Sequence, residues 1–249
     1  MSSNEYMTSV PYIDPRINTR MKLFSNPYVP ELGETQSQKL SGKEMDNVVK
    51  TGTTTVGLTT NEGVVLATDM RASLGGRFVA SKDVQKVEQV HPTAAVTMCG
   101  SVGGAQAFIR SLKAETKLYS MRRGKEMSVK ALATLAGNFL RSNWQVFLIS
   151  PILGGVDKGG NYVYSLDIGG AVMLDNYVAT GSGMQLAYGV LENEYEAGMT
   201  NKKAVKVAAN AIRSASQRDT ASGDGIYVAV ITKKGVEING YKNFEDVTA

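Results

Sequence analysis

The sequence predicts an α+β protein built as a four-layer αββα sandwich, in which two antiparallel sheets pack face to face and a helix pair covers each outer side. Runs of β-branched residues separated by glycine turns indicate antiparallel strands. The expected elements follow one another as strands, two helices, strands, two helices and strands. Because helices that come in pairs are not typical of a simple alternating α/β chain, we expect each pair to cover one sheet.

The first 52 residues differ from the rest of the chain. They hold four of the six prolines and show no sustained helical or strand periodicity, which is typical of a poorly structured arm. The patterned segment begins directly after Gly52. There, TTTVGLTT, a turn at Asn61-Glu62-Gly63 and VVLATDMRA together predict a β-hairpin.

The middle of the chain predicts a helix pair followed by strands. After the extended run AAVTMCG, apolar residues at helical spacing predict a first helix on which Ala105, Phe108, Ile109, Leu112 and Tyr119 share a face. A second helix is predicted from the inward face formed by Leu132, Leu135, Ala136, Phe139 and Leu140. Strands are then predicted in VFLISPILGGV, NYVYSLDI and AVMLDNYVAT, which glycine turns separate.

The last part of the chain predicts a second helix pair and a closing hairpin. One helix is expected near 183–197 and another after Thr200. The inward face of the latter is expected to consist of Ala204, Val207, Ala208, Ala211, Ile212 and Ala215. The runs GIYVAVIT and VEING, joined by the turn Lys233-Lys234-Gly235, predict the final strands.

Composition is that of an ordinary globular protein of 249 residues, with 43% apolar and 20% charged residues. The net charge of +4 comes from basic residues scattered among acidic ones, so we expect a mixed solvated surface and no binding to nucleic acid. Cys99 is the only cysteine, which excludes a disulfide within the chain. Neither a secretion signal nor a membrane-length apolar run is present, so the sequence predicts a cytoplasmic protein that does not enter a membrane.

The available side chains narrow the chemistry. His91 is the only histidine and stands in the turn-like context VHPT, so we interpret it as a packing or surface residue. Metal sites built on several histidines or cysteines are excluded, and we expect no metal and no cofactor. Cys99 is interpreted as a small buried hydrophobe, with a reactive thiol as the alternative. An enzyme with this sequence must therefore activate its nucleophile without histidine.

A threonine at a newly made N-terminus meets that requirement, because its own α-amine can serve as the base. The stretch KTGTTTVG offers such a threonine, Thr53, directly after Gly52 at the border of the arm. Glycine at that position allows unusual backbone conformations beside an attacking hydroxyl, and a removable leader keeps the amine blocked until the protein has folded. On composition alone, this stretch is more often the start of a strand than a cleavage site.

Several separated motifs resemble, in order, those of archaeal-type proteasome β-subunits. From about Thr51 to the last strand these motifs are TGTTTVG, VVLATDMRA, SKDVQKV, CGSVGGAQ, NFLRS, PILGGVD, ATGSG, YGVLE and QRDTASG. The resemblance implies the N-terminal nucleophile hydrolase fold, which is the same αββα sandwich. It also implies that residues 1–52 form a propeptide removed on maturation and that residues 53–249 form the catalytic domain.

The resemblance implies roles for the residues that match family motifs. Thr53 is the expected nucleophile and amine base, and Gly52-Thr53 is the expected cleavage site. Asp69 and Lys86 are expected to flank it, although either alone is more typical of a surface salt bridge. An ammonium near the threonine stabilises the alkoxide-like form of its hydroxyl and lowers the pKa of the neighbouring amine. Lys86 is placed by its local motif rather than by counting, so Lys82 is the competing candidate.

Further matching residues are expected to support the threonine or to bind substrate. The hydrogen-bonded group beside the amine and hydroxyl is expected to be Ser182, Asp219 and Ser222. Their alternative role is loop capping after a helix. Gly100 is expected to stabilise the oxyanion through its backbone N–H. Ala72 and Met98 are expected to line a roomy, uncharged substrate pocket, which implies cleavage chiefly after large apolar residues, whereas the alternative for Met98 is plain core.

The implied function is that of an autoprocessed threonine endopeptidase that degrades unfolded proteins in the proteasome core particle. The implied partners are α-type subunits, other β-subunits in stacked heptameric rings and, indirectly, a regulatory ATPase ring. One alternative is a structural β-type subunit, in which one or more of the positions of Thr53, Asp69 and Lys86 is typically altered. The other is a bacterial two-ring threonine protease that works without α-type subunits, whose chains are usually shorter.

Overall fold

The computed structural model describes residues 52–143 and 147–247 of the chain. The chain divides into two units, residues 1–46 and 47–249, and all described residues belong to the second. The predicted propeptide therefore lies outside the described residues except for Gly52, and no finding on its structure follows. Within the described ranges, no helix has the length and apolar character needed to cross a membrane.

One sheet is antiparallel and has the strand order β10-β1-β2-β11-β12. Its strands are β1 (Thr54–Thr59), β2 (Val64–Asp69), β10 (Tyr177–Gly181), β11 (Ile226–Thr232) and β12 (Gly235–Tyr241). The predicted first and last hairpins, β1-β2 and β11-β12, are confirmed. The strand β2 lies between β1 and β11, so that its last residue, Asp69, pairs with Ile226 at the end of the sheet where β1 begins.

The second sheet is also antiparallel and has the order β5-β6-β7-β8-β9. Its strands are β5 (Val87–His91), β6 (Ala94–Thr97), β7 (Ile152–Asp157), β8 (Gly160–Leu166) and β9 (Val172–Asp175). A separate two-stranded sheet consists of β3 (Ala72–Leu74) and β4 (Phe78–Ser81). The sequence analysis did not anticipate β3, β4 or β5, which are three to five residues long.

Two predicted strands differ from the structure. The run VFLISPILGGV is not one strand, because β7 begins only at Ile152 and Leu148 has a φ of 47° in the left-handed region. The run AVMLDNYVAT is split at Asn176 into β9 and β10, which belong to different sheets. The carbonyl of Asn176 accepts hydrogen bonds from the backbone N–H and the hydroxyl of Thr59, so the chain leaves one sheet and joins the other at this residue.

The four predicted helices are confirmed as α3 (Val102–Arg123), α4 (Val129–Ser142), α6 (Met184–Glu194) and α7 (Asn201–Ser216). A short 3-10 helix, η1 (Phe244–Asp246), follows the last strand. Side-chain oxygens of Ser101, Ser128 and Thr200 accept hydrogen bonds from backbone N–H groups in the first turns of α3, α4 and α7. These caps satisfy donors that have no partner inside the helix, which explains where the helices begin.

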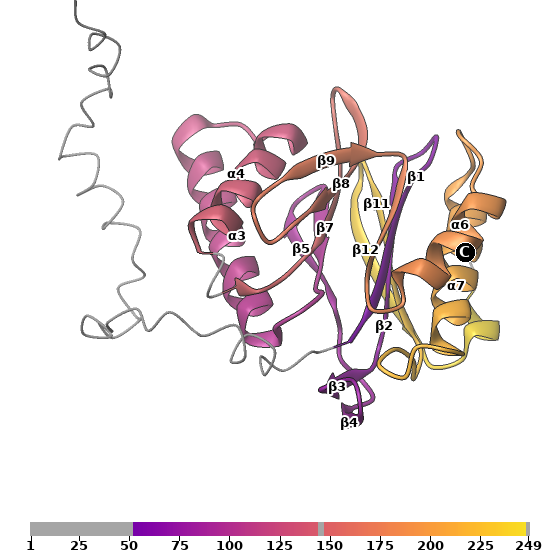
Figure 1. The fold of residues 1–249 in the computed structure, drawn as a ribbon. Helices are drawn as coiled ribbons and strands as arrows, with labels where there is room; N and C mark the ends of the chain where they lie inside the picture. Colours follow the sequence, from indigo (N-terminus) through magenta and orange to yellow (C-terminus); the bar gives the residue numbers. More distant parts are fainter. Residues whose placement is uncertain (1–51, 144–146, 248–249) are drawn as a thin grey trace, which may run out of the picture. The chain divides into compact units, whose positions relative to one another are not determined.

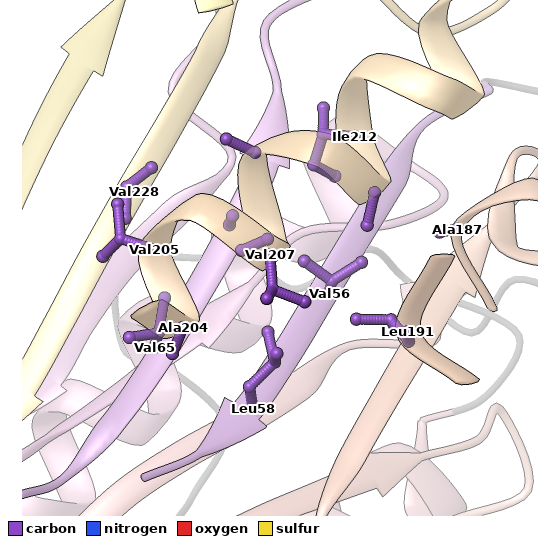
Figure 2. Close-up of a cluster of buried hydrophobic side chains, with 14 of the residues drawn as sticks. Val56, Leu58, Val65, Ala187, Leu191, Ala204, Val205, Val207, Ile212 and Val228 are labelled. Atoms are coloured by element: carbon purple, nitrogen blue, oxygen red, sulfur yellow. The ribbon is translucent and has the colours of Figure 1, made fainter. Parts of the chain in front are cut away.

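The described part of the second unit has the predicted four layers, with α3 and α4 outside one sheet and α6 and α7 outside the other (Figure 1). Three apolar clusters separate these layers. Figure 2 shows one of them, in which Val56 of β1 and Val65 of β2 lie among side chains of α6 and α7, including Val207. Every layer therefore buries the apolar face of its neighbour, as expected for a sandwich.

The two sheets approach closely because glycines lie between them. A Cβ atom on Gly57 would lie 2.9 Å from Ile152 Cγ2, and one on Gly154 would lie 2.8 Å from Val64 Cγ1. Both distances are too short for a side chain. Leu66, which is fully buried, occupies the remaining space between these glycines. The packing between the sheets thus depends on a few large side chains facing glycines.

Leu66→Ala is expected to lower the free energy of unfolding by about 2–5 kcal/mol, because it leaves a cavity between two sheets that cannot collapse onto it. Urea denaturation of the isolated chain measures this difference. Leu174→Ala in β9, where the leucine is 58% exposed, is the matched control and should change stability by about 0.5 kcal/mol or less. Equal losses in the two variants would contradict the proposed importance of the inter-sheet core.

Candidate active site

Thr53 lies directly before β1, and its hydroxyl stands between a cation and a carbonyl. Its Oγ1 donates a hydrogen bond to the carbonyl oxygen of Gly52 (2.6 Å) and accepts one from Nζ of Lys86 (3.1 Å). The Gly52-Thr53 peptide bond is intact in this structure. The backbone nitrogen of Thr53 is therefore an amide, which stands in for the α-amine that cleavage would produce. This N–H donates to Oγ of Ser182 (3.1 Å).

Asp69 and Lys86 form a buried ion pair beside Thr53. Nζ of Lys86, the residue just before β5, lies 2.7 Å from Oδ1 of Asp69, the last residue of β2. Both side chains are almost fully buried. The carboxylate also accepts hydrogen bonds from the backbone N–H groups of Thr54 (3.0 Å), Arg71 (3.0 Å) and Gly223 (2.9 Å). All these partners are donors, which favours the ionised form of Asp69.

Burial and pairing have opposite effects on these two groups. Burial raises the pKa of Asp69, and the Lys86 ammonium and the backbone donors oppose that rise. Burial lowers the pKa of Lys86, and the carboxylate of Asp69 opposes that fall. We assign the pair as charged, because four donors surround the carboxylate. The lowered pKa makes the ammonium a readier proton donor than a surface lysine would be.

The two lysine candidates lie in different surroundings. Lys82 is exposed, and its carbonyl oxygen accepts a hydrogen bond from Nζ of Lys242 (3.2 Å). Lys86 contacts both Thr53 and Asp69. The geometry therefore favours Lys86 over Lys82, and a surface salt bridge does not describe a pair as buried as Asp69 and Lys86.

Ser182, Asp219 and Ser222 form a hydrogen-bonded chain that ends at Thr53. Oγ of Ser182, just after β10, donates to Oδ2 of Asp219 (2.5 Å), and Oγ of Ser222 donates to the same oxygen (2.6 Å). The hydroxyls of Ser222 and Thr54 are 2.7 Å apart. Asp219 also caps its own turn by accepting the N–H of Ala221 (3.1 Å), so the loop-capping interpretation and the network both hold.

A small cavity of about 20 Å³ lies beside the threonine. Its lining consists of Gly52, Thr53, Ala72, Val84, Lys86, Met98, Gly100 and Val102. Ala72 and Met98 both line this cavity, but it is smaller than the roomy pocket that the sequence predicts, and Lys86 adds a charged side chain to the lining. Met98 also packs against the core beneath α3 and α4. Gly100 has a φ of 109°, and a Cβ there would lie 2.3 Å from the carbonyl oxygen of Leu148, so only glycine fits.

Cys99 and His91 take the packing roles that the sequence predicts. Burial raises the pKa of the Cys99 thiol to about 11, so the thiol is protonated and inert at neutral pH. His91 is buried at the end of β5, where its Nδ1 accepts the N–H of Thr93 and its Nε2 lies 3.2 Å from Oε2 of Glu126. Burial lowers the pKa of His91. Among the described residues, no cluster of His, Cys, Asp or Glu side chains could hold a metal.

Sequence reasoning missed several groups that complete the site. The backbone N–H groups of Arg71 and Gly223 bind Asp69, and the N–H of Gly52 donates to Oγ of Ser73 (3.1 Å). Backbone donors leave no side-chain signature in a sequence, so only the fold could reveal them. Gly52 has a steric reason of its own, because a Cβ there would lie 1.8 Å from Cβ of Ala221.

Comparison with known proteins gives matches over most of the chain. A model of the proteasome subunit family matches residues 49–231. The proteasome subunit beta of Natronomonas pharaonis is 61% identical over 222 residues, which is 89% of this chain and 92% of that protein. The proteasome subunit beta of Natrialba magadii is 60% identical over 222 residues, with 89% and 91% covered. For that of Halomicrobium mukohataei the identity is 55% over 231 residues, with 93% and 97% covered.

These matches are longer than the segment that follows Gly52, so they extend into the predicted propeptide. The family match covers the second sheet, the four described α-helices and the first sheet except β12 and the last residue of β11. The fold, the family match and the identities agree, and the chain therefore belongs to the proteasome family as an archaeal-type β-subunit.

Proposed function

We propose that this chain is the threonine endopeptidase subunit of the proteasome core particle and that it is made as a zymogen that cleaves its own Gly52-Thr53 bond. The observation that carries this proposal is the position of Thr53 Oγ1, which contacts both the Lys86 ammonium and the carbonyl oxygen of Gly52. A single hydroxyl thus lies between a group that stabilises its negative charge and the carbonyl that it would attack.

Self-processing would use this arrangement directly. The Thr53 hydroxyl adds to the Gly52 carbonyl carbon, the bond to the Thr53 nitrogen breaks, and the acyl group moves from nitrogen to oxygen. The hydroxyl proton is transferred to the leaving nitrogen, beside which Ser182 and Asp219 are hydrogen-bonded. Water then hydrolyses the ester, which releases residues 1–52 and leaves a free amine on Thr53.

Substrate hydrolysis would use the same nucleophile with a new base. The freed α-amine of Thr53, with an ordinary pKa of about 8, accepts the hydroxyl proton as the oxygen attacks a peptide carbonyl. Lys86 stabilises the oxygen and lowers the pKa of the amine through its charge. Gly100 lines the cavity, and its N–H is the proposed donor to the oxyanion. Water releases the acyl group in the second half of the reaction.

Two other functions are less well supported. A structural subunit does not need an intact Thr53, Asp69 and Lys86, yet all three are present here and in contact. A bacterial two-ring protease is less well supported because the relatives that match most of this chain are named proteasome subunit beta.

As a proteasome β-subunit, the chain assembles with other proteasome subunits. We propose that these are α-type and β-type subunits in stacked heptameric rings that an ATPase ring supplies with unfolded proteins.

Thr53→Ala is expected to retain residues 1–52 and to have no peptidase activity, because both reactions need the same hydroxyl. A gel of the co-expressed particle and a fluorogenic peptide assay measure the two effects. Thr59→Ala, which removes a hydroxyl at the far end of β1, is the matched control and should be processed and active. A processed, active Thr53→Ala particle would overturn the mechanism.

The rate of peptide hydrolysis is expected to have a bell-shaped pH dependence. Activity rises as the Thr53 amine loses its proton, at a pKa of about 8 or lower. It falls again as Lys86 loses its proton, and this limb should lie below pH 10.5 because burial lowers the pKa of Lys86 from that value. The measurement is kcat/KM of the processed particle from pH 5 to 11. A rate that continues to rise through pH 10.5 would contradict the role given to the Lys86 ammonium.

Peptides with Leu or Tyr before the cut bond are expected to be cleaved at least about 10-fold faster than peptides with Arg there. The charged side chain in the cavity lining is the cation Lys86, which repels a guanidinium. The other side chains of the lining include the uncharged Ala72, Val84, Met98 and Val102, which offer it no partner. Met98→Glu should raise the relative rate after Arg. Equal or faster cleavage after Arg by the unmodified protein would count against this pocket assignment.

A further inference from the structure

Arg71 connects two parts of the site that are far apart in the sequence. Its backbone N–H donates to Oδ2 of Asp69 (3.0 Å). Its guanidinium reaches residues 219–225, which we call the site loop. There Nε donates to Oδ2 of Asp224 (2.7 Å) and Nη1 donates to the carbonyl oxygen of Thr220 (2.8 Å). One side chain thus fixes the site loop at two points relative to the end of β2.

The site loop supplies groups to both sides of Thr53. Its Gly223 N–H binds Asp69 Oδ2 (2.9 Å), and the carbonyl of Gly223 accepts the N–H of Met70 (3.1 Å). Its Asp219 carboxylate accepts the hydroxyl of Ser182, which in turn binds the Thr53 nitrogen. A shift of this loop would therefore disturb the carboxylate that holds Lys86 and the network at the Thr53 nitrogen together.

The site loop has a backbone conformation that needs support. Asp224 has a φ of 64°, which places it in the left-handed region that side chains other than glycine adopt at a cost. A Cβ on Gly223 would lie 2.7 Å from Nη2 of Arg71, so the guanidinium packs directly on this glycine. Conformations of this kind persist where surrounding contacts hold them. The contact of Arg71 with Asp224 is such a contact.

The charge of Arg71 also acts on the site. Its hydrogen bond to Asp224, together with the charges of Asp224, Asp69 and Asp219, raises the pKa of Arg71, although burial opposes this. The guanidinium is therefore held in a group of three carboxylates, two of which belong to the site loop. The cation that contacts Asp69 directly is Lys86 (2.7 Å).

We propose that Arg71 and Asp224 are positioning residues for the threonine chemistry. Their ion pair holds the site loop so that the Gly223 N–H meets Asp69 while Asp219 and Ser222 meet Ser182 and Thr54. This inference rests on the proposed function, because it assigns the pair a role in leader removal and peptide hydrolysis. The pair acts through Asp69 and Asp219 and takes no part in bond making or breaking.

The test is a double-mutant cycle in the particle co-expressed with an α-type subunit, with Arg71→Met, Asp224→Asn and the double variant. Asparagine tolerates the left-handed region, so Asp224→Asn removes the charge and keeps the turn. We expect each single variant to remove its leader about 10-fold more slowly. We also expect kcat per processed chain to fall about 10-fold with KM changed less than about 2-fold. The double variant should be no slower than the slower single variant, because both substitutions remove the same interaction, that between Arg71 and Asp224.

Further variants separate positioning from stability. Arg71→Lys keeps the charge but not the two-point contact, so its rate should lie between those of wild type and Arg71→Met. Lys113→Met breaks the exposed Lys113–Glu88 pair (2.9 Å) and should leave both rates unchanged. Thermal unfolding of each particle shows how far stability falls. Variants that unfold at lower temperature yet keep wild-type kcat would overturn the inference, as would additive effects of the two substitutions.

The failure of the proposed function would look different. If wild type itself kept residues 1–52 and cleaved no peptide, like Thr53→Ala, the enzyme assignment would be wrong and this inference would fall with it. If wild type were processed and active while Arg71→Met and Asp224→Asn matched it, only the positioning role would be wrong.

Discussion

The buried ion pair of Lys86 and Asp69 is the interaction on which the rest of the site depends. Two charges removed from water are stable only when hydrogen bonds satisfy their remaining donors and acceptors. Here the carboxylate accepts hydrogen bonds from the backbone N–H groups of Thr54, Arg71 and Gly223. The ammonium donates a hydrogen bond to the Thr53 hydroxyl. These donors come from β1, the end of β2 and the loop before β11, which lie together because β2 pairs with both β1 and β11.

Glycines allow the backbone to close around Thr53. A Cβ on Gly181 would lie 1.9 Å from the carbonyl oxygen of Thr53, and one on Gly183 would lie 2.1 Å from Oγ1 of Thr54. Together with Gly52 they permit contacts that no side chain would allow. The same device acts on a larger scale between the sheets, where Gly57 faces the opposite sheet. The site and the core therefore share one constraint, which is that neighbouring atoms occupy the space where a side chain of these glycines would lie.

Periodicity predicted the layers, the outer hairpins and the four helices, because amphipathic helices and β-branched runs have strong local patterns. It did not show that AVMLDNYVAT crosses between sheets at Asn176, since β9 and β10 form one continuous run in the sequence. The expected site residues came from motifs, and the structure brings them together, although their roles stay predictions. The supporting N–H of Gly223 and the ion pair of Arg71 depend on tertiary contacts that no motif displayed.

The most direct test of the central claim is the intact mass of the wild-type chain, purified after co-expression with an α-type subunit. The account predicts a chain that begins at Thr53, because the hydroxyl beside Lys86 would have cleaved the Gly52-Thr53 bond. A full-length chain of 249 residues in an assembled particle would contradict it, since the site would then be complete and yet unable to perform its first reaction.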